Sequence, residues 1–264
     1  MLIGAAVCPH PPALISEVGG DALADLATRA VAVVRRLIAA APDVIVVAGG
    51  PDPHLSGRVA KTGRERPEWL DGGAGGTTDR FGVRFSIGAG SDALALPGMV
   101  GCWLLDQGGW TGQRRFLTVP MDFPAADCAA LGAALAEGAA SVGLLAMGDG
   151  SSSRTDTSPS AFQPEAAAFD AEAFEAVTAP DPDRLLALDG DLAVRVGVAG
   201  LSAWQVLAGA LSAGGDPRSW GSEMGEMATT TGVAYLLAFL RPEPTGQSNA
   251  QRGSTDSNPP LGRR

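Results

Sequence analysis

Cysteine and lysine are scarce in this chain, and each shortage excludes a class of protein. The cysteines, Cys8, Cys102 and Cys128, are odd in number and far apart, which excludes a disulfide framework and a zinc ribbon. Lys61 is the only lysine, the formal net charge is −10, and no row of arginines could neutralise a run of phosphates. We therefore expect a protein of the reducing cytoplasm that does not bind nucleic acid.

Long apolar runs are also missing. No segment reaches the roughly 18 to 20 apolar residues that a membrane-spanning helix needs, so we expect no membrane contact. The first apolar run stops at Pro9 and follows no basic residue, which favours a core strand over a signal peptide. Hydrophobic residues still make up 45% of the chain and aromatic residues only 5%, so the core should consist mainly of Ala, Val and Leu.

Segments with the apolar patterns of strands and helices alternate along most of the chain. Strands are predicted at residues 2–8, 44–47, 115–119, 142–147 and 229–240, and helices at 21–41, 91–107, 124–138, 167–177, 184–196 and 203–211. This order predicts one α/β domain over residues 1–242, with a mostly parallel central sheet and helices on both faces. Residues 51–90 are predicted to form a long excursion over the strand ends, and residues 243–264 a disordered tail.

The two histidines of the chain, His10 and His54, each follow an apolar run of the kind that builds a buried strand. The carboxyl ends of strands form the ligand crevice of an open parallel sheet, so both imidazoles are candidates for contact with a metal or a substrate. Prolines on both sides of His10 restrict its backbone. The alternative for His10 is a residue that fills a strand-end turn, and for His54 a residue of a loose loop.

A small polar turn, residues 148–153, follows the predicted strand 142–147. Asp149 in this turn could ligate a metal or orient a base; the alternatives are an Asx-turn and a helix N-cap. The turn amides could bind an anion, which keeps a hydrolase or phosphorylase as a third hypothesis, although neither a P-loop lysine nor a G-x-S-x-G elbow is present. Glu223 and Glu226 are further carboxylates, with surface charge as the alternative.

Several of these segments together resemble one known family. They are residues 6–14, the strand end at 49–51, and residues 147–151, 203–209 and 232–235. They are similar to the actinobacterial branch of the class III extradiol ring-cleavage dioxygenases over residues 2–240. The resemblance implies an extradiol dioxygenase-like α/β fold. In active members it also implies an Fe(II) held by two histidines and a glutamate, which binds O₂ beside a catechol-type aromatic diol, and a further histidine that acts as base.

The resemblance transfers to this chain only in part. His10 matches the first iron ligand, and His54 falls in the region of the second. The turn that should hold the base histidine contains Asp149 instead, and no carboxylate stands near Leu201, where the glutamate ligand is expected, which leaves Asp149 or Glu223 as the third ligand. Two hypotheses remain: an Fe(II)-dependent dioxygenase that uses His10 and Asp149 in catalysis, and a non-catalytic relative that binds a small molecule or a protein partner. A homo-oligomer stays open.

Overall fold

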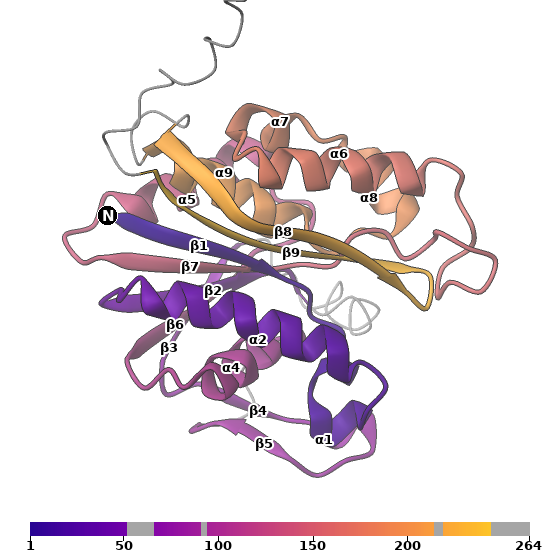
Figure 1. Cartoon of the computed structure of the whole chain (residues 1–264), viewed down its shortest axis with the longest axis horizontal. Helices are drawn as coiled ribbons and strands as arrows, with labels where there is room; N and C mark the ends of the chain where they lie inside the picture. The colour runs from indigo at the N-terminus through magenta and orange to yellow at the C-terminus, as the bar shows by residue number, and fades with distance from the viewer. Residues whose placement is uncertain (52–65, 91–93, 214–218, 244–264) are drawn as a thin grey trace, which may run out of the picture.

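A seven-stranded sheet runs through the centre of the protein (Figure 1). The computed structural model describes residues 1–51, 66–90, 94–213 and 219–243. In the order in which they pair, the strands are β3 (Glu68–Asp71), β6 (Gln113–Thr118), β2 (Val44–Gly49), β7 (Val142–Met147), β1 (Leu2–Cys8), β9 (Val233–Pro242) and β8 (Trp220–Thr230). Two further short strands, β4 (Gly75–Thr77) and β5 (Ser86–Gly88), pair only with each other.

The four central strands, β6, β2, β7 and β1, are all parallel. On one side β3 joins this core as an antiparallel strand, and on the other side the β8–β9 hairpin does so through β9. Every residue of β2 and β7 is buried, as expected for parallel strands that are covered on both faces. The prediction of an α/β fold with a mostly parallel sheet is therefore confirmed.

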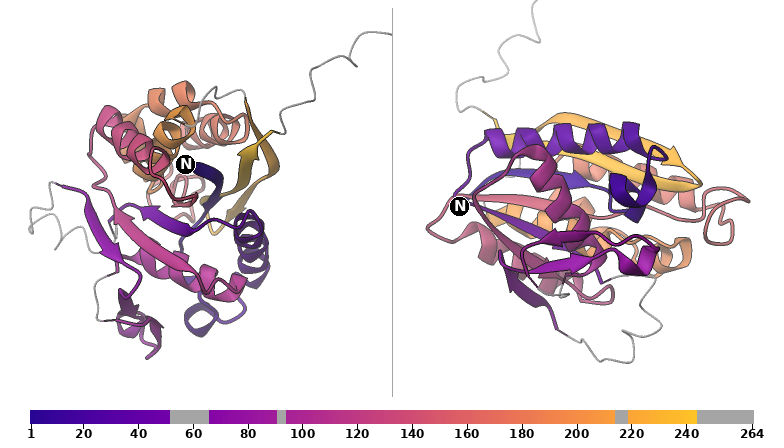
Figure 2. Two further views of the ribbon diagram at one scale, coloured as in Figure 1. Left: turned by 90° about the vertical axis from the view of Figure 1, so that its left-hand side faces the viewer. Right: turned by 90° about the horizontal axis from the view of Figure 1, so that it is seen from below.

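Helices cover both faces of the sheet (Figure 2). The first layer consists of α2 (Ala24–Ala39) and α4 (Leu96–Gly108), which share a hydrophobic core with Ile45 and Val47 of β2. The second layer packs against Val46 and Ala48 of the same strand; it consists of α5 (Ala125–Ala136), α6 (Ala166–Thr178), α7 (Pro182–Ala187), α8 (Gly190–Val196) and α9 (Leu201–Ala213). Because successive side chains of a strand point to opposite faces, one continuous apolar run supplies side chains to the cores under both helix layers.

Short helical turns fill two of the connections. After β1 the chain forms the turn η1 (Pro12–Leu14) and the short helix α1 (Ser16–Gly19), and between β4 and β5 it forms η2 (Asp79–Phe81). Within the described ranges, none of the helices is both long and apolar enough to cross a membrane.

Three predicted segments differ from the structure. The predicted strand 229–240 contains the turn between β8 and β9. The sequence pattern does not predict β8, because the side chains of this edge strand are mostly half-buried and form no apolar run. The predicted helix 184–196 is two helices, because Asp189 accepts a hydrogen bond from the Leu192 amide at 3.0 Å and caps the start of α8. The predicted excursion 51–90 contains β3, β4 and β5, while its residues 52–65, like residues 244–264 of the predicted tail, lie outside the described residues.

Candidate functional site

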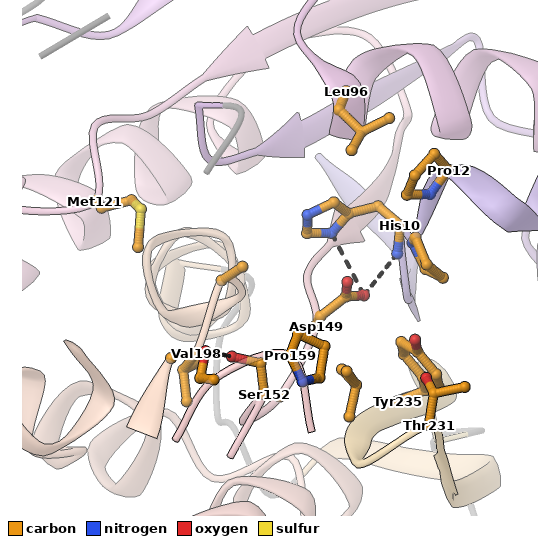
Figure 3. A pocket seen from close by; sticks show the side chains of 16 residues that line it. His10, Pro12, Leu96, Met121, Asp149, Ser152, Pro159, Val198, Thr231 and Tyr235 are labelled. Carbon is orange, nitrogen blue, oxygen red and sulfur yellow. Dashed lines mark hydrogen bonds and ion pairs between the residues drawn. The ribbon is translucent and has the colours of Figure 1, made fainter. Parts of the chain in front are cut away.

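A cavity of about 500 Å³ lies at the carboxyl ends of β1 and β7 (Figure 3). Its described lining comes mainly from five parts of the chain: the segment after β1, the turn after β7, the loop that follows that turn, the connection before α9, and the start of β9 with the turn before it. Leu96 and Met121 complete the described lining. The lining residues are His10, Pro11, Pro12, Leu96, Met121, Asp149, Gly150, Ser152, Pro159, Ser160, Gly197, Val198, Ala199, Thr231, Val233 and Tyr235. This is the edge of the sheet at which the sequence places a site.

His10 and Asp149 meet in this cavity although they are 139 positions apart in the chain. The parallel pairing of β1 with β7 places Cys8 beside Met147, so the residues that follow each strand emerge side by side. The His10 amide donates a hydrogen bond to Asp149 Oδ1 at 2.7 Å, and the imidazole Nδ1 lies 3.6 Å from the same oxygen. The carboxylate therefore holds the backbone of His10 in place, and the ring lies beside it.

The His10 imidazole is buried, with only 2% of its surface exposed. Its Nδ1 has no hydrogen-bond partner within the described part of the protein, because 3.6 Å to Asp149 is longer than a hydrogen bond. The second ring nitrogen, Nε2, points away from Asp149 toward the side of the cavity where Met121 lies (Figure 3). The ring thus has a carboxylate on one side, beyond hydrogen-bond distance, and presents a nitrogen to the cavity on the other.

Asp149 links two strands and does not cap a helix. Besides its contact with His10, its backbone pairs with Tyr235 in an isolated β-bridge, and its carbonyl accepts a hydrogen bond from the Ala199 amide at 3.0 Å. The next helix, α6, begins only at Ala166. The N-cap alternative for Asp149 is therefore wrong, and its carboxylate lies beside the imidazole of His10.

Four backbone amides of the turn after β7 donate hydrogen bonds to other groups of the protein. The amides of Gly148, Gly150 and Ser152 donate to carbonyls of Cys8, Ala234 and Val196, respectively, at 2.8 to 3.0 Å. The Ser151 amide donates to the carboxylate of Asp170 at 2.7 Å. The expectation that these amides are free to bind an anion is wrong, because each of the four already has an acceptor.

Tyr235 is a site residue that the sequence did not single out as a candidate. It lies near the start of β9, lines the cavity and is 3% exposed. Burial raises the pKa of its phenol to about 12, and the negative charge of Asp149 adds to this effect. The antiparallel pairing of β9 with β1 brings the start of β9 to the carboxyl end of β1. No local pattern of residues predicts that pairing.

The described lining of the cavity is mostly apolar. Proline, leucine, methionine and valine side chains make up much of it, and no lysine or arginine is among the described residues that line it. Ser152, Ser160, Thr231 and Tyr235 add hydroxyl groups. Ligand sites of this composition bind molecules with an apolar body and a few polar groups, which the polar side chains orient.

Glu223 lies at the other end of the hairpin strand. Ala228 of β8 is the residue paired with Tyr235, and Glu223 is five positions before it, which corresponds to about 16 Å along a strand. Its carboxylate forms ion pairs with Arg36 of α2 and with Arg241 of β9. The structure does not bring Glu223 to His10, so its assignment as the third metal ligand is corrected to that of an ion-pair partner.

Glu226 has a similar role on β8. Its carboxylate forms an ion pair with Arg29, which lies about two helical turns before Arg36 on α2. Both glutamates thus pair with basic residues of the helix that packs on this edge of the sheet. Surface charge, the alternative given for both glutamates, therefore fits them, and each carboxylate is paired with an arginine of α2.

The described residues do not complete an Fe(II) site of two histidines and one carboxylate. They bring together one imidazole, His10, and one carboxylate, Asp149, and within the described ranges no three His, Cys, Asp or Glu residues form a metal-binding group. His54, the predicted second ligand, lies outside the described residues. A protein site for such an iron needs three donors on one face, and this pair supplies two.

Neither a scan against protein-family models nor a search of curated proteins returned a match. The function of the site is therefore inferred from the residues that form the cavity.

The burial of Tyr235 predicts a pH dependence that can be measured directly, because it is the only tyrosine in the chain. The pKa is about 12 in the folded protein and 10.0 in the unfolded chain, so the folded state binds the phenolic proton more tightly. The resulting stabilisation is complete below pH 10 and is lost as the pH rises from 10 to 12. Ultraviolet titration of tyrosinate should give a midpoint near pH 12 in the folded protein.

Tyr235→Phe is the control for this titration. The variant should give no tyrosinate signal. Between pH 10 and 12, its free energy of unfolding, measured with urea, should fall less than that of the wild-type protein. A wild-type midpoint close to that of a free tyrosine, about pH 10, would show that Tyr235 is in contact with water.

Proposed function

We propose that the protein binds an uncharged aromatic hydroxyl compound of the catechol type in the cavity at the strand ends, with His10 as the acceptor of the hydroxyl hydrogen. The observation that carries this proposal is the His10–Asp149 pair, in which a buried imidazole lies 3.6 Å from a carboxylate at the wall of a largely apolar cavity. The carboxylate holds the backbone of His10 through its amide, which keeps the imidazole at the cavity wall, where it can accept a hydrogen from a bound hydroxyl group.

The size and lining of the cavity support a small aromatic ligand. A volume of about 500 Å³ falls within the range typical of small-molecule sites. Prolines, Leu96, Met121 and Val233 supply apolar surface against which a ring can pack. The described lining offers no lysine or arginine to neutralise an anionic ligand, so an uncharged ligand fits it best.

His10 and Tyr235 give the cavity one hydrogen-bond acceptor and one hydrogen-bond donor. His10 Nε2 accepts the hydrogen of one hydroxyl, and Asp149 holds the backbone of His10 through the hydrogen bond to its amide. Tyr235 keeps its own hydrogen at neutral pH, because its pKa is about 12, and is a hydrogen-bond donor in the lining of the cavity.

A second candidate function is Fe(II)-dependent extradiol ring cleavage, to which the family resemblance points. The observation in its favour is the buried Nδ1 of His10, which has no hydrogen-bond partner in the described part of the chain. Bound iron would supply the activation of O₂. The described residues supply two of the three donors that the iron needs. Binding without ring cleavage is therefore the first proposal.

His10→Ala tests the proposed function. The substitution removes the hydrogen acceptor from the cavity and should weaken the binding of catechol about tenfold or more, as measured by isothermal titration calorimetry. Glu223→Gln is the matched control, because its carboxylate is paired with arginines on α2 and β9, and it should bind catechol like the wild-type protein. Equal affinity in the wild-type protein and His10→Ala contradicts the proposal.

Titration with Fe(II) under anaerobic conditions separates the two candidates. Protein treated with a chelator is compared with protein incubated with Fe(II), and the dissociation constant of catechol is measured for both. The proposed function predicts equal dissociation constants and less than stoichiometric iron. Stoichiometric iron that is lost in both His10→Ala and His54→Ala, together with ring-opened product in air, contradicts it in favour of the second candidate.

A further inference from the structure

Asp170 is a fully buried carboxylate on α6, and its hydrogen-bond partners belong to the segment that follows Asp149. Its Oδ1 accepts a hydrogen bond from the Ser151 amide at 2.7 Å. Its Oδ2 accepts one from the Ser151 hydroxyl at 2.6 Å and one from Arg154 Nη1 at 2.9 Å. Burying a carboxylate is costly unless its oxygens are paired, and here both oxygens are paired.

The turn after β7 packs directly on this carboxylate. A Cβ atom at Gly150 would lie 2.7 Å from Asp170 Oδ1, so only a glycine allows the backbone to approach so closely. The backbone of the turn is also tied to β9, because the Gly150 amide donates to the Ala234 carbonyl at 2.8 Å. Asp170 is the charged side chain that fixes the turn from the helix side.

The position of Asp149 depends on this turn, because Asp149 and Ser151 are separated only by Gly150. Asp149 in turn holds His10 through the 2.7 Å hydrogen bond to its amide. A chain of direct contacts therefore runs from Asp170 to Ser151, through two peptide bonds to Asp149, and on to His10. Asp170 itself does not line the cavity.

From these contacts we infer that Asp170 is a positioning residue, which sets the place of the Asp149 carboxylate against His10 and thereby the affinity of the cavity for its ligand. The effect on affinity rests on the proposed function. The effect on His10 does not, because it follows from the contacts alone. Small displacements of an oriented polar group weaken its interaction with a ligand strongly, so a residue outside the cavity can control binding.

Asp170→Asn tests this inference with little change in size. An amide replaces one carboxylate oxygen by a donor, which cannot accept a hydrogen bond from Ser151 or Arg154. We expect about tenfold weaker binding of catechol and a displaced imidazole signal of His10 in the NMR spectrum. The chain has two histidines, so His54→Ala identifies the signal of His10. Glu172→Gln is the matched control, since it removes an exposed carboxylate from the same helix, and it should change neither value.

The outcomes of this experiment are distinct. If thermal unfolding shows that Asp170→Asn does not fold, Ser151→Ala replaces it, because this substitution removes only the 2.6 Å hydrogen bond and should displace the His10 signal less, with a smaller loss of affinity. A His10 signal that stays at its wild-type position in the folded variant overturns the inference. If the wild-type protein does not bind catechol, the proposed function fails, and the His10 signal alone decides the role of Asp170.

Discussion

The parallel pairing of β1 with β7 is the constraint on which the site depends. Its register sets Cys8 beside Met147, and the residues that follow, His10 and Asp149, are then joined by a hydrogen bond of 2.7 Å. The pairing is itself stabilised by the burial of both strands between two helix layers, because apolar side chains on each face of the sheet leave water. The same packing that stabilises the fold therefore also determines which polar groups meet at its edge.

The polar contacts around the cavity form a continuous set. Asp149 contacts His10 of the segment after β1, and its backbone pairs with Tyr235 of β9. Behind it, the turn is tied to Asp170 of α6 and to the Val196 carbonyl at the end of α8. Elements from the beginning, the middle and the end of the described chain thus meet around one carboxylate. A site supported in this way is held rigidly, which favours a ligand whose polar groups match fixed partners.

Part of this arrangement could be predicted from the sequence. The strands at 2–8 and 142–147 are continuous apolar runs, and His10 and Asp149 follow them at the edge where parallel strands place ligands. The position of Tyr235 could not be predicted, because it depends on the non-local pairing of β9 with β1. Glu223 was misassigned since β8 has no apolar run, and an exposed carboxylate looks the same in sequence whether it faces a metal or an arginine. The buried role of Asp170 depends on how α6 packs, which its own sequence does not reveal.

If the proposed function holds, His10 and Asp149 act as a unit in binding the ligand, and a double-mutant cycle measures this coupling most directly. The dissociation constant of catechol is determined for the wild-type protein, His10→Ala, Asp149→Asn and the double variant. If Asp149 acts through His10, the double variant should bind catechol no more weakly than His10→Ala alone. Losses of affinity that multiply in the double variant would show that the two residues act independently and would contradict the account.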